Sequence, residues 1–120
     1  MSPEFKNERF FTNWVLGQAR RRGWKCAHLE TMRVVRTPNG PRAVPNVDAT
    51  GFPDVVLVHE THGLIFAELK MKYRKPDDAQ LAWHDALRAA GVPIYVFYPD
   101  DVDAIVWLLD TGDVPQMELA

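Results

Sequence analysis

Two carboxylates and one lysine, Asp54, Glu68 and Lys70, are the residues best suited to chemistry. Paired carboxylates repel each other and neither is easily buried as an ion, so something has to offset the cost of bringing them together. A divalent cation would do so, held by Asp54, Glu68 and the backbone carbonyl of Leu69, with waters completing its shell. Lys70 would then orient or help deprotonate the attacking water and stabilise charge on a phosphate oxygen. Spacing alone leaves a second interpretation open, in which Asp54 caps a strand and Glu68 and Lys70 form a surface ion pair.

A predicted β-hairpin brings these residues together. Two apolar segments, 54–59 and 63–70, are strand-like, and the three residues between them are typical of a short turn. Pairing that is symmetric about the middle of the turn places the two carboxylates side by side, and alternation of side chains puts Lys70 on the face of Glu68. Both faces are apolar near the hairpin tip, which predicts a sheet covered on two sides.

Hydrophobic periodicity and turn residues predict the remaining elements. The segment 36–51 holds three prolines and two glycines and is expected to be a long loop, and the tail 111–120 has no convincing signal. The order αβββαβα follows, an α/β fold with a central mixed sheet flanked by helices. The expected elements are a helix over 4–22, strands over 24–30, 54–59 and 63–70, a helix over 76–91, a strand over 93–98 and a last helix from residue 100 or 101.

Length and composition predict one globular domain over residues 1–120, because 120 residues with 47% hydrophobic content suffice for a single core. The single cysteine, Cys26, excludes an intramolecular disulfide and a thiolate zinc site and favours a reducing compartment. The first residues resemble no signal peptide, and no apolar stretch approaches the ~18 residues of a membrane span. We therefore expect a cytoplasmic protein without membrane contact.

The charge is divided unevenly along the chain. Residues 1–75 carry 13 basic against 7 acidic residues, whereas residues 76–120 carry 1 against 9. A basic segment of this kind suits a polyanion such as nucleic acid, although a solvated helix end and loop would show the same charge. The candidate phosphate contacts, which would leave the base sequence unread, are Arg33, Arg36, Arg42, Lys72, Arg74 and Lys75.

The residues also resemble a known nuclease family. Gly51-Phe52-Pro53-Asp54, followed by an apolar strand and Glu68-Leu69-Lys70, resembles the PD-(D/E)XK signature of the restriction-endonuclease-like superfamily. Within it, the chain is similar to the stand-alone VRR-NUC domains of bacteriophages. The resemblance covers about residues 8–106, and its further landmarks are Glu8, Gly23-Trp24, His28, Gln80, Trp83, Ala90-Gly91-Val92 and Tyr98-Pro99-Asp100.

The resemblance implies a restriction-endonuclease-like core and Mg²⁺- or Mn²⁺-dependent hydrolysis of DNA phosphodiester bonds, with no organic cofactor. It implies metal ligation by Asp54 and Glu68 and a catalytic role for Lys70. It also implies a supporting role for Gln80 and a first-helix acid at Glu8. The glutamine often found one turn after that acid is replaced here by Thr12. Homodimers that act on branched or flapped DNA, in a bacterial or phage-infected cell, are the further expectation.

Other functions stay open at this point. A Holliday-junction resolvase or restriction-type nuclease of the same superfamily would differ in its substrate. A non-catalytic nucleic-acid-binding or assembly module would keep the fold without the reaction, and a subunit that needs an activating partner would cut only in its presence. A zinc-protease site at His59-Glu60-Thr61-His62 is disfavoured, because its histidines are three residues apart on a predicted turn instead of four apart on a helix.

Overall fold

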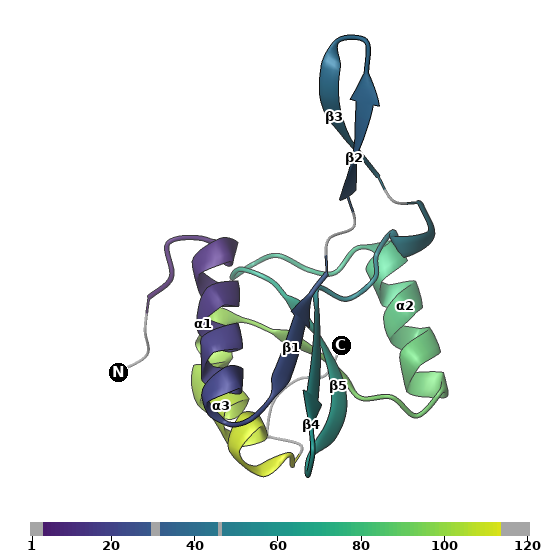
Figure 1. Cartoon of the computed structure of the whole chain (residues 1–120). Coiled ribbons are helices and arrows are strands. Elements are labelled where there is room, and N and C mark those ends of the chain that lie inside the picture. The colour runs from purple at the N-terminus through teal and green to yellow at the C-terminus, as the bar shows by residue number, and fades with distance from the viewer. Residues whose placement is uncertain (1–3, 30–31, 46, 114–120) are drawn as a thin grey trace.

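A four-stranded mixed sheet lies at the centre of a mixed α/β fold (Figure 1). The computed structural model describes residues 4–29, 32–45 and 47–113. The strand order is β1-β4-β5-β6, in which β5 and β6 are parallel and the other neighbours antiparallel. The strands are β1 (Lys25–His28), β4 (Val55–His59), β5 (Gly63–Leu69) and β6 (Ile94–Phe97).

The predicted register of the β4–β5 hairpin is confirmed. Val56 pairs with Phe66 and Val58 with Leu64, so the ladder is symmetric about the middle of the turn. Side chains alternate across β5, and Ile65, Ala67 and Leu69 all enter the hydrophobic core. Phe66 and Glu68 therefore project from the opposite face.

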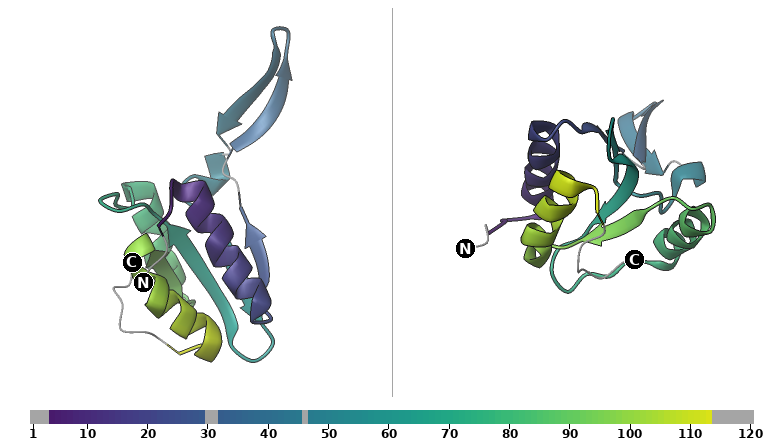
Figure 2. Two further views of the ribbon diagram at one scale, coloured as in Figure 1. Left: turned by 90° about the vertical axis from the view of Figure 1, so that its left-hand side faces the viewer. Right: turned by 90° about the horizontal axis from the view of Figure 1, so that it is seen from below.

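Helices cover both faces of the sheet (Figure 2). Two of them, α1 (Glu8–Arg21) and α3 (Val102–Thr111), lie on the face that holds the core, and α2 (Asp78–Ala89) lies on the other. The predicted two-sided cover is wrong at the hairpin tip, where Val58 and Leu64 are 46% and 41% exposed. The reason is that α2 is the one helix on that face and packs on β6 and, through Trp83, on Phe52.

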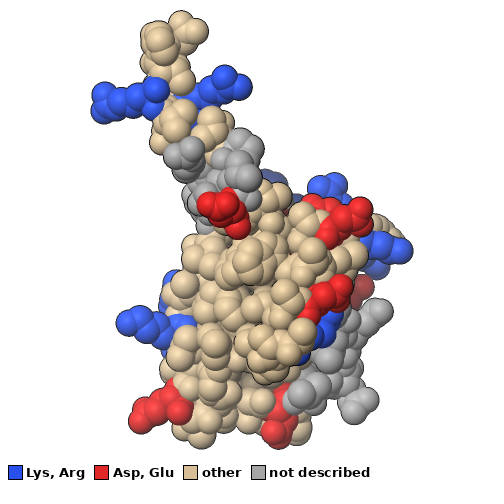
Figure 3. All heavy atoms as spheres, turned by 90° about the vertical axis from the view of Figure 1, so that its right-hand side faces the viewer, with Lys and Arg blue, Asp and Glu red and all other residues tan. Residues whose placement is uncertain are grey.

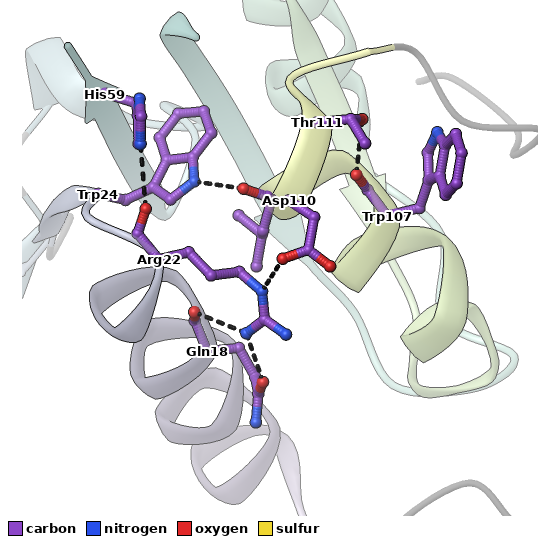
Figure 4. A network of polar contacts seen from close by, with 8 residues as sticks. Gln18, Arg22, Trp24, His59, Trp107, Asp110 and Thr111 are labelled. Atoms are coloured by element: carbon purple, nitrogen blue, oxygen red, sulfur yellow. Dashed lines mark hydrogen bonds and ion pairs between the residues drawn. The ribbon is translucent and has the colours of Figure 1, made fainter. Parts of the chain in front are cut away.

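A polar network joins α1, β1, β4 and α3 at the end of the molecule that holds this tip (Figure 4). The Arg22 guanidinium pairs with Asp110 at 2.5 Å, and the indole N–H of Trp24 donates to the backbone oxygen of Leu109 at 2.9 Å. His59 Nε2 lies 3.0 Å from the backbone oxygen of Arg22. Part of the basic charge counted in the sequence therefore holds helices together.

A second hairpin replaces most of the predicted loop over 36–51, so that prediction is wrong. Strands β2 (Met32–Thr37) and β3 (Gly40–Pro45) form a separate two-stranded sheet. A 3₁₀ turn at Val47–Ala49 follows. The two-residue turn makes Thr37 and Gly40 a hydrogen-bonded pair. Because antiparallel pairs alternate, Pro41 and Pro45 occupy positions that need no N–H donor, which is how prolines fit into these strands.

Smaller differences concern the ends of elements. The first helix begins at Glu8 instead of residue 4, because the Asn7 side chain caps it by accepting the N–H of Phe10 at 3.1 Å. The first strand ends at His28, and the predicted strand residue Glu30 lies outside the described residues. The last helix reaches Thr111, and residues 114–120 also lie outside them. Within the described ranges, no helix is both long enough and apolar enough to cross a membrane.

Candidate active site

The predicted site residues gather at the edge of the sheet opposite the Arg22 network. This edge holds the beginning of β4, the end of β5 and the first turns of α1 and α2 (Figure 1). Asp54 comes directly before β4, and its backbone oxygen accepts the N–H of Leu29, the residue after β1, at 2.7 Å. Main-chain hydrogen bonds therefore fix the backbone of the first carboxylate.

Asp54 and the end of β5 are joined directly. The Asp54 Oδ2 atom accepts the backbone N–H of Leu69 at 3.1 Å. In a strand, the N–H and C=O of one residue point to the same side, so the Leu69 carbonyl also faces Asp54. The oxygens that the sequence predicts as cation ligands thus lie on adjoining strands at one edge.

Glu68 is fully buried, with 0% of its side chain exposed. One carboxyl oxygen accepts the amide N–H of Gln80 at 3.0 Å, and the other has no hydrogen-bond partner among the described residues. Burial, followed by the negative charge of Asp54 and a hydrogen-bonding interaction with its side chain, raises the pKa of Glu68 to about 9. Without a cation, this carboxyl therefore holds a proton at neutral pH.

Gln80 is positioned by the start of α2. Its side-chain oxygen accepts the backbone N–H of Asp77 at 2.9 Å, while the Asp77 carboxylate accepts the backbone N–H of Gln80 at 2.9 Å. This reciprocal capping leaves the amide N–H₂ of Gln80 directed at Glu68. The turn before β4 packs closely against the first turn of α2. A Cβ on Gly51, whose φ is +80°, would lie 2.7 Å from the backbone nitrogen of Gln80.

His84 also belongs to the cluster. It lies one helical turn after Gln80, is 0% exposed, and places Nε2 3.5 Å from the Glu68 oxygen that makes no hydrogen bond. Burial and then the charge of Arg88 lower the pKa of His84, which favours the neutral ring. The four-residue spacing from Gln80 puts both side chains on one helix face, so the sequence allows both of them to face the site.

Lys70 and Glu8 complete the cluster. The backbone N–H of Lys70 donates to the backbone oxygen of Phe97 in β6 at 3.0 Å. The positive charge of Lys70 opposes, without cancelling, the rise in the pKa of Glu68 and Glu8. Desolvation and then the charge of Asp54 raise the pKa of Glu8, which is the first residue of α1 and is exposed to solvent. Thr12 is buried and its hydroxyl donates to the Glu8 backbone oxygen at 2.9 Å, so it supports the helix.

The predicted phosphate contacts divide into two groups. Lys72, Arg74 and Lys75 are exposed on the segment that follows β5, where Lys72 also lies 3.7 Å from Asp100. Arg36 and Arg42 are exposed on the β2–β3 hairpin. Arg33 has its backbone in β2, and its side chain lies outside what the structure describes.

The donor set fits a hard divalent cation. Within residues 4–29, 32–45 and 47–113, no three His, Cys, Asp or Glu side chains are arranged to hold a metal. Asp54, Glu68 and the Leu69 carbonyl offer oxygen alone, which suits Mg²⁺ or Mn²⁺ with waters filling the remaining positions. The specific sign is the buried Glu68 oxygen that makes no hydrogen bond among the described residues, since such an atom is costly unless something binds it.

Comparisons with known proteins give no relative. No protein-family model matches the chain, and neither the curated proteins nor the solved structures give a significant match.

Proposed function

We propose that the chain is a metal-dependent DNA endonuclease of the VRR-NUC type, with a restriction-endonuclease-like core and a preference for branched or flapped DNA. The observation that carries the proposal is the joining of Asp54 to the end of β5 beside a fully buried Glu68, one of whose oxygens makes no hydrogen bond among the described residues and lies 3.5 Å from His84 Nε2. A purely structural pair of carboxylates would be expected to satisfy these atoms within the protein.

Each residue of the cluster has a defined task. Asp54, Glu68 and the Leu69 carbonyl would hold Mg²⁺ or Mn²⁺, which when bound supplies Lewis-acid stabilisation of the negative charge that develops on the phosphate. Lys70 holds an ammonium beside the scissile phosphate and orients the attacking water. Gln80 orients Glu68 through the hydrogen bond of 3.0 Å, and a ligand held in this way is positioned for the cation before it arrives.

Glu8 and the basic residues that surround the candidate site contribute to substrate binding. Glu8 extends the acidic side of the cluster from α1, close enough for the charge of Asp54 to add to desolvation in raising its pKa. Lys72, Arg74 and Lys75 follow Lys70 directly in the chain, so they attract the DNA backbone toward the reacting phosphate. One domain of 120 residues offers little surface for a duplex, and a homodimer would enlarge it.

The test is cleavage of labelled DNA by the wild type, Lys70→Ala and Lys25→Ala. Lys25 is exposed on β1, near the end of the molecule that holds the Arg22 network, so its substitution controls for the loss of one positive charge. We expect cutting of flap, splayed-arm or four-way-junction DNA in Mg²⁺ or Mn²⁺, none in EDTA, and loss of activity in Lys70→Ala alone. DNA binding without cutting in any metal would instead indicate a binding module or a subunit that awaits a partner.

A further inference from the structure

The β2–β3 hairpin, residues 32–45, forms an arm that projects away from the body (Figures 1 and 2). Its strands pair with each other and lie in a sheet separate from that of the body. Each strand has six residues, so the arm is about 20 Å long. A two-stranded ribbon of this kind has no core of its own, which makes contact with another molecule the natural role for its surface.

The chain is hydrogen-bonded to the body on either side of the arm, at Leu29 and at Thr50. On the entering side, Leu29 donates its backbone N–H to Asp54 at 2.7 Å. On the returning side, the backbone oxygen of Thr50 accepts the indole N–H of Trp83 of α2 at 3.0 Å, and the chain reaches Asp54 four residues later. DNA with a phosphate in the site would therefore lie near the base of the arm.

The arm carries positive charge on both of its faces. Residues 32–45 include three arginines and no acidic residue. Arg42 pairs with Val35, the neighbour of Arg36 on β2, so the two arginines project from opposite faces of the ribbon. Both side chains are exposed, and basic side chains leave the arm on both sides (Figure 3).

A thin ribbon with this charge pattern suits a branch in DNA. A linear duplex lying against the arm contacts one face and leaves the other arginine in solvent. Two duplex segments that diverge from a branch present a phosphate backbone to each face at once. With side chains on both faces the ribbon is roughly 10 Å thick, which is narrow enough to enter between two diverging duplexes.

We propose that the arm inserts between two duplex segments of a branched DNA, with Arg36 contacting the backbone of one segment and Arg42 that of the other. The inference rests on the proposed nuclease function and assigns its preference for branched substrates to these two residues. A second copy of the chain is the competing occupant, and the three arginines with no acidic residue favour a polyanion over it.

The test compares Arg36→Ala, Arg42→Ala and the double variant with the wild type. Binding to a splayed or flapped DNA and to a linear duplex of equal length is measured by fluorescence anisotropy in EDTA at several salt concentrations. The slope of log K against log salt falls in magnitude by about 0.9 for each phosphate that the protein no longer neutralises. On branched DNA we expect a decrease of about 0.9 for each single variant and about 1.8 for the double variant, and on linear DNA no more than about 0.9 for the double variant.

Arg21→Ala is the matched control, because Arg21 is exposed at the end of α1 that lies away from the arm. Equal decreases on both DNA shapes, or no decrease, would overturn the inference. A change of oligomeric state in light scattering with unchanged salt slopes would assign the arm to a second copy, and would also overturn it. Cleavage in Mg²⁺ by the same variants and by Lys70→Ala separates the two proposals. If DNA is cut and the cutting needs Lys70, but the arginine variants change binding to branched and linear DNA equally, the arm proposal is wrong and the nuclease proposal stands. If the arginine variants weaken binding to branched DNA alone and no protein cuts, the nuclease proposal is wrong and the arm still binds branches.

Discussion

At the scale of single residues, the ionised form of Glu68 is unusually unfavourable. Its carboxyl has no exposed surface, lies beside another acid, and keeps one oxygen without a hydrogen-bond partner among the described residues. Two neighbours contact this carboxyl: Gln80 donates a hydrogen bond to one oxygen, and the neutral ring of His84 lies 3.5 Å from the other. A residue held at this cost is a candidate for function.

Glu68→Gln should change how the stability of the metal-free protein depends on pH. The pKa of Glu68 is raised from 4.5 to about 9 in the fold, so the folded chain holds a proton that the unfolded chain releases between these values. The free energy of unfolding therefore falls as pH rises through this window, by up to about 1.4 kcal/mol per pH unit. Urea unfolding at pH 6 and pH 8 in EDTA should show a smaller decrease for Glu68→Gln than for the wild type, and equal decreases would contradict the assigned protonation.

Gln80→Ala should weaken Mn²⁺ binding about 10- to 100-fold, because the amide that orients Glu68 is removed. Isothermal titration calorimetry measures the affinity directly, without DNA and without activity. Leu81→Ala is the control, since it shortens the adjacent, 41% exposed side chain of the same helical turn. An unchanged affinity in Gln80→Ala would show that Glu68 is not positioned for a cation through this hydrogen bond.

At the scale of elements, the site depends on how closely the turn before β4 fits the first turn of α2. Gly51 has a φ of +80°, and the space where a Cβ would lie is filled by the backbone of Ala79 and Gln80. A side chain there would displace the beginning of α2 and, with it, the amide that contacts Glu68. One glycine therefore links the GFPD turn to the geometry of the carboxylates.

Gly51→Ala should destabilise the fold by about 1–3 kcal/mol, because it combines an unfavourable φ with a backbone clash. Gly17→Ala is the matched control. Gly17 lies inside α1 with nothing within 4 Å of its would-be Cβ, so the same change there should stabilise the protein by about 1 kcal/mol. Thermal unfolding of the two variants measures the decrease in stability at Gly51 and the increase at Gly17. An unchanged stability of Gly51→Ala would mean that the turn can move away from α2 without cost.

The elements also show what the sequence could predict. Two apolar segments around a short turn are sufficient to predict the β4–β5 register. The register in turn predicts that Asp54 lies close to the end of β5. The β2–β3 hairpin was missed because its prolines suggested a loop, and the positions that tolerate proline become clear only when the ladder is known. The spacing of Gln80 and His84 allowed both to face the site, but the contact of His84 with Glu68 depends on which face of α2 meets β5, and tertiary packing decides that.

At the scale of the whole molecule, the fold separates a packed body from an arm that adds no strand to its sheet (Figure 2). The core is built by α1, α3 and the four-stranded sheet, and none of the described side chains of the arm, residues 34–44, belongs to it. The body holds the candidate site, and the arm extends from the same edge. Stability and substrate preference are therefore expected to reside in different parts of the chain.

Replacement of residues 32–45 by two glycines should leave the body folded. Met32 pairs with Pro45, so the two ends of the arm are already neighbours and a short linker can join them. We expect a cooperative thermal transition and a circular dichroism spectrum close to those of the wild type. Loss of the cooperative transition would show that the arm stabilises the body.

The most direct test of the central account is the rate at which Asp54→Asn cuts a labelled flap DNA in Mg²⁺, measured beside the wild type with enzyme in excess. Asp54 Oδ2 meets the backbone of Leu69, and the substitution removes one charged oxygen ligand while it keeps the shape of the side chain. The account predicts metal-dependent cutting by the wild type and a rate at least about 100-fold lower for a folded Asp54→Asn. Equal rates for the two proteins would contradict it.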